Sequence, residues 1–381
     1  MTAMSHDSLP VDAPRRRRTP EQTRADRRRR MPFLIFGLAF FACAIYGGLW
    51  RLGFDLPHGA AVAGLHGPLM ICGFFGTLIG LERAVALGKG ILFTSPALSI
   101  AGSLAAAAGA PERIVAALYL GAGVILAAAS FSVLRVERHL FTLVLALGAS
   151  AFAVGNAVWL AGGAIPDAVA WWLLFLVLTI AAERLEMSRL LGIGRTEQAT
   201  FALIVLALLI GAAPGLFSPW GASLTGLGFL FLALWLVRHD IALRNIRRAP
   251  HLRFFGICMA AGYGWMALAG ASLLLASPAA AAYGYDLVLH AVLIGFVLSM
   301  ALGHSIIVIP ALTGAAAPYH GSMYIGLALL HGSIALRVVS DLLEWQPGRM
   351  ASGPLTLLGL IAFLVVLVRQ IRAASRLRRA S

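Results

Sequence analysis

The chain has 381 residues, of which 60% are hydrophobic and only 12% are charged, and its mean hydropathy is +0.87. Soluble domains carry roughly 25% charged residues, so this composition excludes a water-soluble globular protein. The formal net charge is +14, but almost all the basic residues lie in the two tails or in short loops between apolar runs. That placement indicates membrane topology and excludes a nucleic-acid-binding surface.

Cys43, Cys72 and Cys258 fall inside apolar runs without metal-binding spacing, which excludes a disulfide framework and a zinc site.

Apolar runs of membrane-spanning length recur along the chain. A bilayer core needs about 20 residues per helix, and a lipid-exposed segment must satisfy its own backbone hydrogen bonds. The first run follows RRRR-MPF without a small-residue cleavage site, so we expect a retained helix rather than an export signal. The sequence therefore predicts an all-α, polytopic membrane protein. Its twelve expected spans are 31–52, 60–81, 91–110, 114–134, 140–162, 166–182, 198–217, 220–237, 253–277, 284–312, 321–343 and 353–371.

The basic residues predict the orientation of these spans. With the N-terminus inside, the inner segments hold 26 basic residues, and the outer ones hold only Arg51, Arg113 and Arg349. Such a bias predicts that both termini are cytoplasmic. We expect residues 1–30, with nine arginines, to be a disordered tail, 31–371 to be the twelve-helix domain and 372–381 to be a basic tail. Beyond the bilayer itself, anionic lipid is the expected partner of these arginine-rich tails.

A faint repeat of Glu-Arg pairs marks the inner ends of three spans: Glu82-Arg83, Glu137-Arg138 and Glu183-Arg184. The repeat hints at duplicated helical hairpins. The alternative that we favour is that each arginine extends toward lipid phosphates while the glutamate sits in the interface.

Four histidines lie inside the expected spans, where a polar residue is a functional candidate by default. With a rise of about 1.5 Å per residue, His66 on span two and His290 on span ten both lie roughly 9 Å below the outer surface. His304 lies roughly 21 Å deeper than His290 on the same helix, close to the level of His331 on span eleven. The sequence thus predicts an outer pair, His66 and His290, and an inner pair, His304 and His331.

Two imidazoles at one depth on different helices suit axial ligation of a haem iron. The inner pair offers ligands for copper or for a second iron, since imidazole suits both metals. Arg337 and Asp341, four residues apart on span eleven, are expected either to pair with each other or to meet haem propionates. Small residues that would let a porphyrin approach the backbone are Gly64, Gly67, Gly295 and Gly303. The alternative is structural: an intramembrane histidine often only hydrogen-bonds across helices, and glycine-rich faces often serve close packing.

Two stretches, LHGPLMICGFFGTLIGLERAVAL and HAVLIGFVLSMALGHSIIVIPAL, resemble NnrS-type membrane proteins. These are twelve-helix haem- and copper-containing proteins linked to nitric oxide metabolism, similar in architecture to the catalytic subunit of haem-copper oxidases. The resemblance implies a multi-pass protein of the bacterial inner membrane that binds haem b and also copper. It places the low-spin haem ligands on His66 and His290. The oxidase-type adjacent His-His pair is missing from this sequence, so a three-histidine copper centre is not expected.

Two other functions remain compatible with the sequence. A secondary transporter would use discontinuous helices around a midplane site, with His331, Asn156 or Glu183 as candidate proton relays. The scarcity of mid-span carboxylates argues against it. A structural partner of a respiratory complex, with its tails on anionic lipid, is the third possibility.

Overall fold

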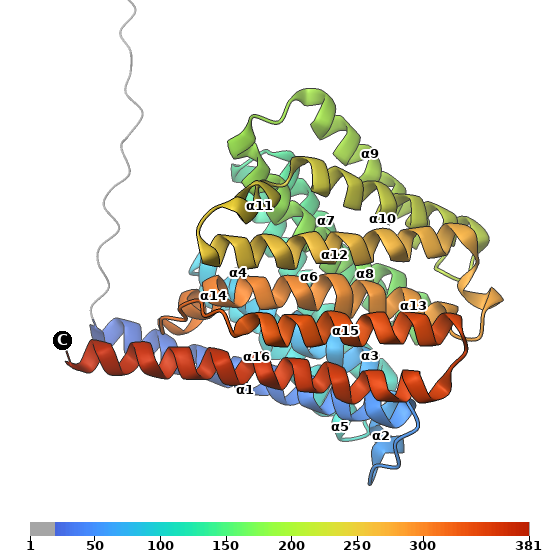
Figure 1. Cartoon of the computed structure of the whole chain (residues 1–381), viewed down its shortest axis with the longest axis horizontal. Helices are drawn as coiled ribbons and strands as arrows, with labels where there is room; N and C mark the ends of the chain where they lie inside the picture. The colour runs from blue at the N-terminus through green and yellow to red at the C-terminus, as the bar shows by residue number, and fades with distance from the viewer. Residues whose placement is uncertain (1–19, 381) are drawn as a thin grey trace, which may run out of the picture.

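The protein is a bundle of long helices that run along one common direction (Figure 1). The computed structural model describes residues 20–380, and within this range there is no strand. Twelve of the helices are long and apolar enough to cross a membrane. The predicted all-α, multi-pass fold is therefore confirmed.

The helices are connected mostly by short turns. In chain order they are α1 (Pro20–Arg51), α2 (Gly59–Ala63), α3 (His66–Pro68), the π-helix η1 (Leu69–Phe75), α4 (Gly76–Leu87), η2 (Gly90–Phe93), α5 (Thr94–Ala107), α6 (Glu112–Val136), α7 (Leu140–Leu160), α8 (Ile165–Ser188), η3 (Arg189–Leu191), α9 (Arg195–Ala212), α10 (Pro219–His239), α11 (Ile241–Arg244), η4 (Asn245–Arg247), α12 (Pro250–Leu275), η5 (Pro278–Ala280), α13 (Gly284–His290), the π-helix η6 (Ala291–Leu298), α14 (Ser299–Thr313), α15 (Met323–Leu342) and α16 (Gln346–Ala380).

Both ends of the described chain lie at the same end of the bundle, which we call the terminal end (Figure 1). The helix α1 begins at Pro20, and α16 continues to Ala380. Residues 20–30 and 372–380, which we expected to be tails outside the helical domain, are thus continuations of the first and last helices. The rest of the expected N-terminal tail, residues 1–19, lies outside the described residues.

The second span begins later than predicted. We expected it to enter at residue 60, but the chain forms the short helix α2, turns at residues 64–65 and starts the membrane-crossing helix at His66. Pro68 gives the physical reason, because proline is tolerated in the first turn of a helix and disrupts a helix interior. His66 therefore opens its span instead of lying roughly 9 Å inside it.

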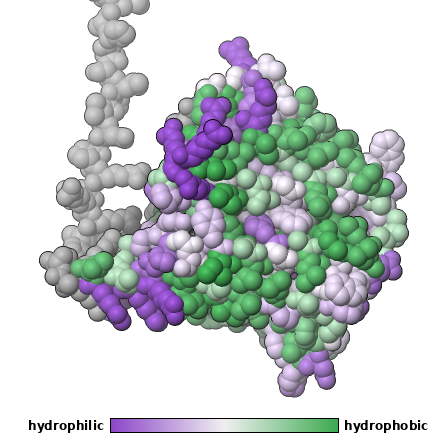
Figure 2. Space-filling view, viewed as in Figure 1, coloured by the Kyte–Doolittle hydropathy of each residue, from purple (hydrophilic) through white to green (hydrophobic). Residues whose placement is uncertain are grey.

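The helix α8 forms the centre of the bundle. It is the most enclosed of the candidate spans, with 72% of its most apolar window buried, against 22% for α1 and for α16. Phe175 of α8 stacks on Phe152 of α7 with the ring centroids 4.6 Å apart, and both side chains are fully buried. The outer helices instead present apolar side chains such as Leu203 and Phe231 to the surroundings. Figure 2 shows hydrophobic side chains over much of one face, with hydrophilic ones concentrated near the terminal end.

Candidate functional site

Two π-helical segments lie directly after two of the predicted histidines. The segment η1 starts three residues after His66, and η6 starts at the residue after His290. Both are embedded in membrane-spanning helices and are the only π-helices in residues 20–380. Such segments are rare and are frequent at functional sites. The backbone therefore singles out the same two histidines as the depth argument.

The structure brings the rings of His66 and His290 together at the end of the bundle opposite the termini. Their centroids are 6.4 Å apart, and the ring planes differ by 17°. The separation is too long for van der Waals stacking, for which atoms approach to about 3.5–4 Å. The two imidazoles, on α3 and α13, thus lie near each other with nearly parallel planes and without direct ring contact.

Both rings have their proton placed by the surrounding backbone. His66 Nδ1 lies 2.7 Å from the carbonyl oxygen of Ala44, and His290 Nδ1 lies 2.8 Å from the carbonyl oxygen of Asp286. A carbonyl oxygen only accepts, so each Nδ1 carries the hydrogen and donates it. Within residues 20–380, all hydrogen bonds of the two rings are made at Nδ1. Each Nε2 therefore keeps its lone pair, which is the tautomer that a metal-bound histidine adopts when its other nitrogen donates to a carbonyl.

His290 is further held by a carboxylate. Its Nδ1 lies 3.1 Å from Asp286 Oδ1, one helical turn earlier. Asp286 Oδ2 accepts hydrogen bonds from Arg337 Nε at 2.9 Å, from Arg337 Nη2, and from Arg349 Nη2 at 3.0 Å. The arginines come from α15 and α16, so three helix ends are joined at one carboxylate.

The second carboxylate of this cluster is Asp341. Arg349 Nε donates to its Oδ1 at 2.6 Å, and Arg337 Nε lies 3.5 Å from its Oδ2. Of the two alternatives expected for Arg337 and Asp341, the structure shows the ion pair between them. Two arginines face two aspartates here, so the cluster, which we call the Asp286 cluster, has no formal net charge. The signal for Asp286 in the sequence was its position four residues before His290, which places both on one helix face.

The glycines near the histidines have two different environments. A Cβ at Gly64 or at Gly67 would have no heavy atom within 4 Å. By contrast, a Cβ at Gly295 would collide with the Trp265 side chain, and one at Gly303 would lie 3.0 Å from Cys258 Cβ. Gly64 and Gly67 thus have open space at their Cβ positions next to His66 in the chain, and Gly64 is exposed. The expectation that Gly295 and Gly303 also have such space is wrong, because residues of α12 fill those positions.

His331 lies within a series of hydrogen bonds that uses both of its ring nitrogens. Trp265 Nε1 donates to His331 Nδ1 at 2.9 Å, so the ring hydrogen is on Nε2, which lies 3.2 Å from Ser299 Oγ. Ser299 Oγ in turn donates to the carbonyl oxygen of Cys258 at 2.8 Å. Both ring nitrogens therefore have partners, and a metal ion could bind only by displacing one of them.

His304, the other predicted inner ligand, has different partners. Arg184 Nη2 donates to His304 Nε2 at 3.0 Å, and His304 Nδ1 lies 3.2 Å from the carbonyl oxygen of Met300. Glu183 Oε2 lies 4.0 Å from the same Nε2. A guanidinium directed at the ring lone pair opposes a metal cation there. Within residues 20–380, no group of three or more His, Cys, Asp or Glu side chains is arranged to hold a metal ion.

Arg184 corrects our interpretation of the Glu-Arg repeat. Its side chain is buried and packs over the ring of Phe255, with the guanidinium carbon 5.1 Å from the centroid. Arg138, its counterpart in the repeat, is exposed as expected. The Glu183-Arg184 pair was visible in the sequence, but the hydrogen-bond partner of Arg184 was not, because His304 is far away in the chain.

The candidate proton relays of a transporter are not connected to one another by hydrogen bonds in the described residues. Asn156 accepts from Cys72 Sγ at 3.6 Å and donates to the carbonyl oxygen of Phe152. The hydrogen bonds that run from His331 through Ser299 end at the carbonyl oxygen of Cys258. Glu183 lies 4.0 Å from His304 and is close enough to Glu82 and Arg83 to interact with their charges.

Residues 30–372 match a family described as a domain of unknown function, DUF8744. The chain belongs to the DUF8744 family. His66, His290 and the Asp286 cluster all lie within the part of this DUF8744 protein that matches. Among curated proteins, the search found no match to it.

Proposed function

We propose that this DUF8744 protein is a haem-binding membrane protein, with His66 and His290 as the two axial ligands of haem b. The observation that carries the proposal is the pair of neighbouring, nearly parallel imidazoles whose Nδ1–H groups donate to carbonyl oxygens. Two metal–nitrogen bonds of about 2 Å, together with roughly 1 Å from each nitrogen to its ring centre, require a centroid separation of roughly 6 Å. The separation of 6.4 Å agrees with this requirement.

The surroundings also fit a flat macrocycle. The open positions at Gly64 and Gly67 lie beside His66 in the chain. Arg337 lies at the same end of the bundle as His290, but it is already paired with Asp286 and Asp341, so we propose that it meets a haem propionate only by giving up one of these contacts. A bound haem would supply one-electron redox chemistry, and the protein would set its potential through the axial ligands and their hydrogen-bond partners.

The ligand set favours redox handling over binding of an external ligand. If His66 and His290 both held the haem iron, nitric oxide would find no free place there and would have to displace a histidine. We therefore propose electron transfer or redox sensing as the primary function, and a part in nitric oxide metabolism or nitrosative stress as its biological setting, on the resemblance to NnrS-type proteins. Copper is a secondary proposal, because His304 and His331 already have polar partners. The bacterial inner membrane is the location that we propose.

Optical spectroscopy tests the proposal. The full chain is produced in haem-replete bacterial cells, purified in detergent and measured oxidised and reduced. We expect a sharp reduced α band and about one haem per chain, and we expect His66→Ala and His290→Ala each to abolish the band. His304→Gln and His331→Gln are the matched controls, since they remove other intramembrane histidines, and both should keep the spectrum.

Two outcomes would contradict the proposal. A colourless preparation, or an α band that persists in both His66→Ala and His290→Ala, excludes this pair as the haem site. Metal analysis of the same samples separates haem iron from a lone copper ion between the two rings, which would give copper without a haem spectrum.

A further inference from the structure

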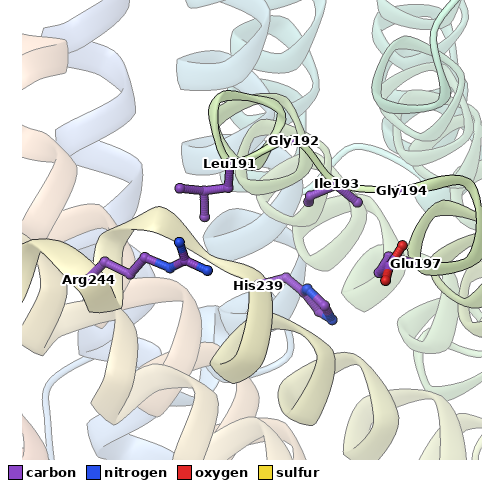
Figure 3. Close-up of a pocket in the computed structure, with 7 residues that line it drawn as sticks. All are labelled: Leu191, Gly192, Ile193, Gly194, Glu197, His239 and Arg244. Atoms are coloured by element: carbon purple, nitrogen blue, oxygen red, sulfur yellow. The ribbon is translucent and has the colours of Figure 1, made fainter.

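A small polar cavity lies at the terminal end of the bundle, far along the helices from His66 and His290. It is a half-open pocket of about 190 Å³ between the turn that joins α8 to α9 and the segment from the end of α10 to α11. Figure 3 shows the residues that line it: Leu191, Gly192, Ile193, Gly194, Glu197, His239 and Arg244.

The charged groups of the cavity are on opposite sides. Arg244 extends from α11 on one side, Glu197 of α9 lies on the other, and His239 lies between them (Figure 3). The cavity is thus bipolar, with a cation and an anion separated by the space that they face. A purely anionic ligand would be repelled by Glu197, and a purely cationic one by Arg244.

Trp235 holds two of the residues that line the cavity, Glu197 through its backbone and His239 through its ring. Trp235 Nε1 donates to the carbonyl oxygen of Glu197 at 3.1 Å, and the Trp235 ring packs on His239 with centroids 4.8 Å apart. Gly194 leaves room for the Glu197 carboxylate, because a Cβ at residue 194 would lie 2.5 Å from Glu197 Oε2. One tryptophan therefore connects the two walls of the cavity.

The cavity lies where two membrane-spanning helices end. Its lining includes Glu197, in the first turn of α9, and His239, the last residue of α10, and both helices are candidate membrane spans. Tryptophan is enriched at this level of a bilayer, where lipid headgroups lie. Farther along the same helices, Leu203 and Leu234 present exposed apolar side chains that suit acyl chains.

We propose that this cavity binds the headgroup of a phospholipid that carries both a phosphate and a primary ammonium group, the phosphoethanolamine chemistry. Arg244 pairs with the phosphate, and Glu197 accepts hydrogen bonds from the ammonium. A trimethylated ammonium has no hydrogen to donate to Glu197, and a glycerol headgroup has no positive charge for it. A pocket of about 190 Å³ is small enough to suit a headgroup and not a whole lipid.

Native mass spectrometry of the full chain in detergent tests this site. The protein receives phosphatidylethanolamine, phosphatidylcholine or phosphatidylglycerol with identical dioleoyl chains. We expect about tenfold greater retention of the ethanolamine lipid than of the choline lipid. Glu197→Gln should reduce this preference to less than twofold, and Arg244→Gln should lower retention of the ethanolamine lipid about tenfold.

The exposed arginines of the neighbouring segment provide matched controls. Arg247→Gln and Arg248→Gln remove the same charge outside the cavity and should leave the preference unchanged. A further arm adds soluble phosphoethanolamine: displacement of the lipid shows that the headgroup alone binds, and no displacement shows that the acyl chains are also needed.

Equal retention of ethanolamine and choline lipids by the unaltered protein would overturn the proposal. So would a preference that survives Glu197→Gln, or one lost equally in the two control variants. Because the readout is lipid mass, the result does not depend on whether haem is bound.

Discussion

Gly48 is the residue of α1 that leaves room for the His66 ring. A Cβ at this position would lie 2.8 Å from His66 Cε1 and 2.9 Å from His66 Nδ1. We expect Gly48→Ala to displace the ring, break its hydrogen bond to Ala44 and lower the haem content of the purified protein. Overpacking of this kind costs about 1–3 kcal/mol.

Gly37→Ala is the matched control on the same helix. Its Cβ would meet its nearest atoms at 3.8 and 3.9 Å, an ordinary contact distance. Replacing a helical glycine by alanine there should stabilise the protein by about 0.5–1 kcal/mol. Thermal unfolding and haem content are measured for both variants. Equal haem content in the two would show that His66 does not need the space at Gly48.

Asp286 is the residue through which the charge cluster acts on His290. We expect Asp286→Asn to destabilise the protein by up to about 3 kcal/mol, at the low end for a broken buried ion pair, because a quarter of this side chain is exposed. It should also raise the midpoint potential of a bound haem, since it removes a negative charge beside an axial ligand. Redox titration and thermal unfolding measure the two effects.

Gln346→Ala serves as the control, because it removes a hydrogen bond from Arg349 Nη1 without changing any charge. It should cost about 0.5–1.5 kcal/mol and leave the potential unchanged. A potential shifted equally by both variants would mean that the cluster acts on the fold and not on His290.

The histidine pair shows how far sequence alone could reach at the residue scale. His66 and His290 were predictable because a histidine in an apolar span is rare and its depth follows from the helical rise. The depth of His66 was wrong, since Pro68 starts the helix later than hydropathy suggests. The π-helical turns were not predictable, because the extra residue in such a turn leaves no mark in the hydrophobic pattern. Arg349 was counted as an outer loop residue, and only the packing of α16 on α15 brings it to Asp286.

At the scale of elements, Arg184 connects the central helix α8 to α14. It is buried and bonded to His304, whereas Arg138 of the same repeat is exposed. We expect Arg184→Ala to leave the His304 Nε2 lone pair without its hydrogen-bond donor, at a cost of about 1–3 kcal/mol. Arg138→Ala should change stability by less than about 0.5 kcal/mol.

Thermal unfolding in detergent measures both variants, and the optical spectrum is recorded alongside. Arg184→Ala should keep the haem spectrum, because His304 lies fourteen residues along the helix from His290, roughly 21 Å away at about 1.5 Å per residue. Loss of the spectrum with unchanged stability would instead make His304 part of the haem site.

At the scale of the whole molecule, the fold was predictable from two constraints that act on every span. Each span had to be long enough for the bilayer and had to satisfy its own backbone hydrogen bonds. The basic residues had to lie on one side of the membrane, so that basic and non-basic loops alternate along the chain. These constraints gave twelve helices, as found. They could not give the bounds of α1 and α16, because both continue beyond the apolar run into arginine-rich sequence that remains helical.

The same alternation predicts which end of the bundle faces the cytoplasm. Lys89 lies in a turn at the terminal end, and Asp55 lies in the loop at the opposite end, next to α2; both are exposed. In a Cys43→Ala background, we expect Asp55→Cys to react with a membrane-impermeant maleimide on intact bacterial cells. Lys89→Cys should react only after lysis, because the positive-inside rule retains the basic segments in the cytoplasm.

This labelling pattern connects the two proposed sites to the two faces of the membrane. Outside labelling of Asp55→Cys would place the histidine pair near the periplasmic surface, and it would place the Arg244 cavity among the headgroups of the cytoplasmic leaflet. Labelling of Lys89→Cys on intact cells would reverse the orientation, and electrons would then reach the histidine pair from the cytoplasm. Labelling of both positions before lysis would mean that the twelve helices do not all cross the bilayer, which contradicts the spans themselves.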